Sequence, residues 1–163
     1  MNRKFFSMKL LEYKIQINAP AEKVWEVLFS QNAEENWPSA INEGTYFEGT
    51  WEEGSIMRFL DAENNGMFNL IEKNIPKKEL KMKHLGWIYD GELSPQDWQD
   101  ATVTYLLESN ENGTFLTAIV NSLEEFVDFF NSKYPPNFEN IKKLSESLFS
   151  SLRNFFLNRK AKP

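Results

Sequence analysis

The chain has 163 residues with a formal net charge of −6, and 41% of its residues are hydrophobic, including fourteen Phe and five Trp. This length fits one domain, which we place at residues 1–163, and the bulky apolar side chains suffice for a large core. The acidic balance argues against a nucleic-acid-binding protein, which would need clustered Lys and Arg. The lack of cysteine excludes disulfides, thiolate catalysis and Cys-ligated metals.

No apolar run reaches the length of a signal peptide, or the roughly 18 consecutive apolar residues of a membrane span. We therefore expect a cytoplasmic protein with no membrane span.

The N-terminal part of the chain predicts a strand followed by helices. Apolar and polar residues alternate over residues 9–17, as in a half-buried strand. Pro20 suits the first turn of a helix, because its missing N–H would have no helical partner anyway. The apolar spacing then predicts a helix over 21–29, with Trp25 anchoring it to a core. A second short helix or turn is expected at 33–41.

Six further strands follow at short intervals and are separated by turn residues such as Asn65-Gly66. Because consecutive strands joined by short turns run antiparallel, they predict an antiparallel sheet. The expected strands are 45–48, 55–60, 67–74, 79–87, 101–108 and 114–121. A loop is expected at 90–100.

The rest of the chain reads as helix. A first piece covers 123–131, Pro135-Pro136 interrupts it, and apolar residues then recur every three or four positions over 138–157. Such a long apolar stripe needs a surface to cover, and the concave face of the sheet provides one. The order of elements predicts an α+β fold. The residues expected to face the sheet are Ile141, Leu144, Leu148 and Leu152.

The run Ile17-Asn18-Ala19-Pro20, followed by Trp25, resembles the opening of the START-like (SRPBCC) superfamily, which begins with a strand, a proline-started helix and a buried tryptophan. Turn motifs elsewhere are similar to the bacterial branch related to the C-terminal domain of the heat-shock ATPase activator. The resemblance covers most of residues 9–157. It implies a helix-grip fold with a ligand cavity and no shared catalytic residues. The turn motifs lie at 51–55, 61–66, 83–86 and 112–117.

Three polar residues lie on otherwise apolar strand faces and are candidates for orienting a ligand. They are His84, Tyr105 and Asn69, and small-ligand pockets usually combine an apolar lining with a few such groups. The alternatives are that the His84 ring bonds a nearby protein group, that Tyr105 extends its hydroxyl to the rim, and that Asn69 faces solvent. A buried His84 without an opposite charge should have a lowered pKa. The predicted ligand-binding residues are His84, Tyr105, Asn69, Met82, Met67, Ile71, Val103, Leu144 and Leu148.

Several kinds of catalytic site lack support in the sequence. One histidine and no cysteine rule out a His-based zinc site or a paired-His mechanism, so we expect no metal and no cofactor. There is no Gly-x-Ser-x-Gly elbow and no phosphate-binding Gly-x-x-x-x-Gly-Lys loop. Neighbouring acidic residues on a strand point apart, so they do not form a catalytic pair.

We therefore expect a protein that binds a small apolar or amphipathic, lipid-like molecule in a cavity between the sheet and the C-terminal helix. One alternative is an enzyme of the cyclase or hydratase type, with His84 and Tyr105 as acid and base. Another is a protein-interaction module with a protein partner, as in the chaperone-activator relatives. A collapsed cavity with an exposed apolar patch would favour that alternative.

Overall fold

The computed structural model describes residues 7–30, 46–97 and 100–160, with the backbone alone for 148–160. The helix or turn expected at 33–41 and the side chain of Leu148 lie outside the described residues. In the described part of the chain, none of the helices combines the length and the apolar composition needed to cross a bilayer.

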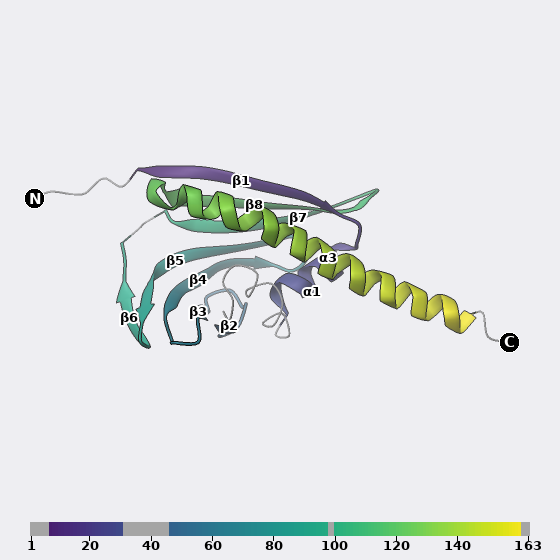
Figure 1. The fold of residues 1–163 in the computed structure, drawn as a ribbon, viewed down its shortest axis with the longest axis horizontal. Helices are drawn as coiled ribbons and strands as arrows, with labels where there is room; N and C mark the ends of the chain where they lie inside the picture. Colours follow the sequence, from purple (N-terminus) through teal and green to yellow (C-terminus); the bar gives the residue numbers. More distant parts are fainter. Residues whose placement is uncertain (1–6, 31–45, 98–99, 161–163) are drawn as a thin grey trace, which may run out of the picture.

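The fold is α+β, with a curved antiparallel sheet and a long C-terminal helix lying across its open side (Figure 1). The strand order is β1-β8-β7-β5-β4-β3-β2, and β6 pairs with β5 outside this series. This arrangement confirms the predicted helix-grip fold. The strands are β1 (Met8–Ile17), β2 (Tyr46–Glu48), β3 (Ile56–Leu60), β4 (Gly66–Ile75), β5 (Glu79–Tyr89), β6 (Glu92–Pro95), β7 (Thr102–Asn110) and β8 (Gly113–Leu123). The helices are α1 (Ala21–Phe29), the short 3-10 helix η2 (Glu124–Phe126) and α3 (Val127–Lys160).

The main core lies where α1 and the middle of α3 meet the concave face of the sheet. Val24 and Leu28 of α1 are fully buried there, together with Phe138 and Ile141 of α3. Trp25 is partly buried and packs against this core, with its ring 4.7 Å from that of Phe29. Burial of these side chains fixes the middle of α3 to the rest of the fold.

The predicted break at Pro135-Pro136 is wrong, because α3 runs through both prolines as one helix. Each proline removes one helical N–H bond, to the carbonyl of residue 131 or 132. Residues 131, 132, 135 and 136 are all exposed, so water can hydrate these carbonyls. The buried residues on the opposite side, Tyr134 and Phe138, hold the helix on the sheet across this point.

The loop predicted at 90–100 contains a strand, β6, at residues 92–95. Asp90 and Gly91 both have positive φ, 50° and 81°, and Tyr89 pairs with Glu92 across them. This is the two-residue hairpin turn that an Asp-Gly pair favours. The sequence therefore carried a hairpin signal that the prediction missed.

We expect Phe138→Ala to lower the free energy of unfolding by about 3–5 kcal/mol, because it removes a buried ring and leaves a cavity. Glu139→Ala, at the exposed neighbouring position, should change it by no more than about 0.5 kcal/mol. Urea denaturation of the two variants measures both values. Equal stability of the two variants would show that α3 does not cover the core.

Candidate functional site

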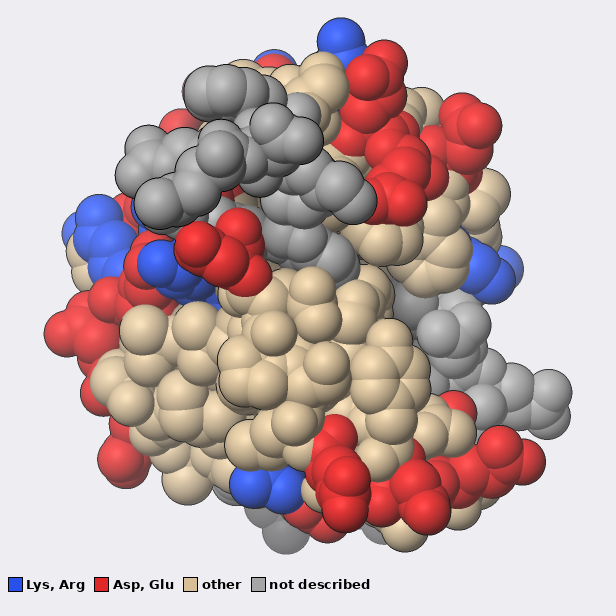
Figure 2. Space-filling view, turned by 90° about the vertical axis from the view of Figure 1, so that its left-hand side faces the viewer, with Lys and Arg blue, Asp and Glu red and all other residues tan. Residues whose placement is uncertain are grey.

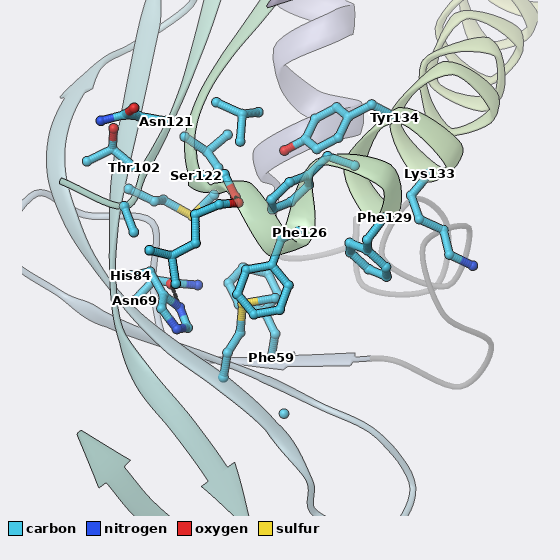
Figure 3. A pocket seen from close by; sticks show the side chains of 18 of the residues that line it. Phe59, Asn69, His84, Thr102, Asn121, Ser122, Phe126, Phe129, Lys133 and Tyr134 are labelled. Carbon is cyan, nitrogen blue, oxygen red and sulfur yellow. Dashed lines mark hydrogen bonds between the residues drawn. The ribbon is translucent and has the colours of Figure 1, made fainter. Parts of the chain in front are cut away.

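A pocket of about 420 Å3 lies between the concave face of the sheet and the first part of α3 (Figure 3). Strands β3, β4, β5, β7 and β8 line one side, and η2 and α3 line the other. Most of the lining is apolar, and the helix side is rich in aromatic rings. This volume is within the usual range for sites that take a small organic molecule.

The pocket lies where β5 changes its neighbouring strand. Residues 79–83 of β5 pair with β7, whereas residues 86–89 pair with β6. His84 sits at the change, and its backbone N–H donates to the carbonyl oxygen of Ala101. β6 lies outside the main strand series, and His84, next to the point where β6 begins to pair with β5, lines the pocket.

A β-bulge at the same place alters which side chains face the pocket. Asn69 of β4 pairs with His84, and Phe68 pairs with Gly86, so Leu85 is the extra residue. The bulge interrupts the alternation of side chains along β5. As a result His84 and Trp87, three positions apart, both line the pocket.

His84 and Asn69 form a polar pair on the sheet side of the pocket (Figure 3). The His84 Nδ1 atom lies 3.1 Å from the Oδ1 atom of Asn69, so the ring donates to the amide oxygen. Burial lowers the pKa of His84 to about 4, as expected, and the ring is neutral at pH 7. Asn69 is only 5% exposed, so the alternative that it faces solvent is wrong.

Tyr105 and Tyr134 form a second polar pair, deeper in the pocket. Their hydroxyl oxygens are 3.2 Å apart, and both residues are buried. The alternative that the Tyr105 hydroxyl reaches the rim is therefore wrong. Burial raises the pKa of Tyr105 to about 12 and that of Tyr134 well above its usual range, so both stay protonated. The ring of Tyr134 also stacks on Tyr13, with centroids 4.8 Å apart.

Charge is nearly absent from the pocket. Among the described residues that line it, Lys133 alone carries a charge, and its amino group points away from the other labelled side chains (Figure 3). No carboxylate borders the pocket in the described chain. The described residues also hold no cluster of three or more His, Asp or Glu that could bind a metal. The lining is therefore suited to an uncharged molecule.

Six of the nine predicted site residues line this pocket. They are Met67, Asn69, Met82, His84, Val103 and Tyr105. Ile71 and Leu144 do not line it: Ile71 is fully buried in the main core, and Leu144 packs against that core farther along α3. The predicted position of Leu148 stays untested, because its side chain is outside the described residues.

The helix side of the pocket was placed too far along the chain in the sequence prediction. Its residues come from the first part of α3 and from η2, because the prolines do not interrupt the helix. Their helical spacing continues through Pro135-Pro136 to Phe138 and Ile141, and this spacing was the available signal. The lining residues missed by the prediction include Trp87, Phe126, Phe129, Phe130, Tyr134 and Asn137.

Comparison with known proteins gives a family match. The model of the family described as Activator of Hsp90 ATPase homolog 1-like protein matches residues 18–131. No curated protein sequence matches the chain.

Solved structures share the fold at low sequence identity. The Aha1 dimer from Colwellia psychrerythraea is similar with a TM-score of 0.65 and 22% identity, over 83% of this chain and 94% of that one. A protein from Mesorhizobium loti has a TM-score of 0.65 and 19% identity, over 85% and 98% of the two chains. A Staphylococcus aureus protein of unknown function has a TM-score of 0.69 and 14% identity, over 89% and 98%.

The lowered pKa of His84 predicts a specific dependence of stability on pH. The unfolded chain binds a proton at this residue near pH 6.5, whereas the folded chain resists protonation until about pH 4. Stability from this source is therefore fully present above pH 6.5 and is lost as the pH falls toward 4. We expect His84→Asn, which keeps a donor for Asn69, to lose less stability than the wild type between pH 7.5 and 4.5.

Urea denaturation at several pH values measures this difference. The two proteins share all their carboxylates, so the contribution of carboxylate titration to the pH dependence cancels in the comparison. Parallel pH profiles for the two proteins would contradict the neutral, buried state of His84.

Proposed function

The chain belongs to the Activator of Hsp90 ATPase homolog 1-like family, and from this premise we propose that it binds one small apolar or amphipathic molecule in the pocket between the sheet and α3. The protein would act as a single domain over residues 1–163, in the cytoplasm, without a metal or cofactor.

The observation that supports this proposal is an apolar pocket whose few polar groups are held neutral. Burial of the ligand's apolar surface would supply most of the binding free energy, at about 25 cal/mol per Å2. His84, Asn69 and Tyr105 would orient the ligand, because their side chains are fixed by hydrogen bonds to protein groups and border the pocket. Groups fixed in this way lose little conformational entropy on binding.

An enzyme of the cyclase or hydratase type has less support. Acid–base catalysis would require His84 and Tyr105 to act on one substrate atom or on neighbouring atoms. Each instead bonds a different residue, Asn69 or Tyr134, and the buried tyrosine hydroxyls resist ionisation. These groups can hold a ligand, but their geometry provides no matched acid and base.

A protein partner is the second candidate function. Phe129, which borders the pocket, is 40% exposed, and the family takes its description from an activator of a chaperone ATPase. Figure 2 shows a broad uncharged area on the face that includes the start of α3 and β6, bordered by both acidic and basic residues. A partner that covered this area would need a largely uncharged surface of its own.

We expect titration with a panel of fatty acids, flavonoids and isoprenoids to include ligands that shift the NMR signals of His84, Trp87 and Tyr105 more than those of Lys81 and Lys83. The first three line the pocket, whereas the two lysines do not. Val103→Trp should abolish the shifts, because the larger side chain fills the pocket from β7.

Thr104→Trp serves as the matched control. Residue 104 neighbours Val103 on β7 but does not line the pocket, so this variant should bind as the wild type does. Absence of any shift across the whole panel would overturn the proposed function, as would unchanged binding by Val103→Trp.

A further inference from the structure

Asn137 is a buried polar residue on the wall of the pocket, and nothing in the described structure satisfies it. The residue is 1% exposed and lines the pocket from α3. Neither its side-chain nitrogen nor its side-chain oxygen has a hydrogen-bond partner. The two donors and the acceptor of one amide are therefore all unused.

This position is unfavourable for folding in two respects. An amide that is buried without a partner loses its hydrogen bonds to water and gains none in return. Asparagine is also a poor residue for the interior of a helix. The buried residues beside it on α3, Tyr134 and Phe138, are large and aromatic, and an apolar residue at 137 would continue the core face. A residue that opposes the local pattern in this way is expected at a functional site.

Other asparagines near the pocket are satisfied by the protein. Asn69 accepts from His84, and Asn121 donates to the carbonyl oxygen of Asp100 at 2.7 Å. Ser145, farther along α3, is also buried without a partner, but it does not line the pocket. Among the described residues, Asn137 is thus the one that presents an unused amide to the pocket.

We propose that Asn137 recognises the polar end of the ligand, and that this end is an uncharged carboxamide or lactam. This inference rests on the proposed function and specifies its ligand class. A carboxamide or a lactam carries a donor N–H beside an acceptor C=O, so it pairs with the oxygen and the nitrogen of Asn137 at once. A carboxylate has no donor and would leave the Asn137 oxygen unpaired, and an ester has no donor either.

The surroundings of Asn137 also favour an uncharged group. No carboxylate lines the described pocket, and His84, Tyr105 and Tyr134 are neutral at pH 7. Lys133 lies one turn before Asn137, but its amino group points away from the pocket (Figure 3). A charged ligand head beside Asn137 would lose its hydration without gaining an opposite charge.

The test compares three probes that share one apolar chain: octanamide, methyl octanoate and octanoate at pH 7.5. We expect the full-length protein to bind octanamide at least about ten-fold more tightly than either of the others in NMR titrations, which corresponds to about 1.4 kcal/mol. Asn137→Leu, which keeps the volume, should bring the affinities for the amide and the ester to within about two-fold. Asn140→Leu, at an asparagine of the same helix that does not line the pocket, should keep the ten-fold preference.

Unfolding measurements complete the test, because Asn137→Leu removes no hydrogen bond within the protein and should be at least as stable as the wild type. A clear loss of stability would mean that Asn137 has a structural partner, and it would overturn the inference. Equal binding of octanamide and methyl octanoate to the wild type would overturn it while leaving the proposed function intact. Tighter binding of octanoate than of octanamide would overturn the inference, because it would indicate a carboxylate that pairs with the amino group of Lys133. Failure of all three probes to bind would count against the inference and the proposed function together.

Discussion

The contacts of Tyr134 determine how closely α3 approaches the sheet, and the pocket depends on them. Its ring stacks on Tyr13 of β1 with an interplanar angle of 7°, and its hydroxyl bonds that of Tyr105 on β7. Beyond this residue, Phe138 and Ile141 close the core against α1 and the sheet. On the N-terminal side of Tyr134, the aromatic side chains of α3 line the pocket. This is where β5 changes its neighbouring strand from β7 to β6. Tyr134 thus belongs both to the closed core and to the lining of the open pocket.

The polar groups around the pocket fall into two kinds, and the difference bears on function. His84, Asn69 and Tyr105 have hydrogen-bond partners within the protein, so they form a rigid neutral wall. Asn137 has none among the described residues, and it lines the opposite, helix side of the pocket, where we propose that a ligand bonds it. An apolar lining with fixed neutral polar groups and one unsatisfied amide is the feature that supports the proposed binding of a small molecule.

The fold was predictable from the sequence because hydrophobic periodicity and turn residues are local signals. Alternation placed Met82 and His84 on the pocket face correctly, but it could not reveal the bulge at Leu85, which depends on pairing with β4 and brings Trp87 to the same face. The proline pair suggested a break, because the loss of helical hydrogen bonds at proline can be read from the local sequence. The packing of Tyr134 and Phe138 that outweighs this loss is a tertiary interaction, which the local sequence does not show. The prediction therefore identified much of the sheet side of the pocket and misplaced its helix side.

We propose that the space beside Tyr134 holds a small molecule. Native mass spectrometry of the protein, purified gently from its own host, tests this claim most directly. We expect a species heavier than the bare chain by the mass of one small organic molecule, and we expect Val103→Trp to lack that species. If the wild-type protein shows only the bare mass, or if the pocket-filling variant retains the added mass, the pocket does not hold a small molecule.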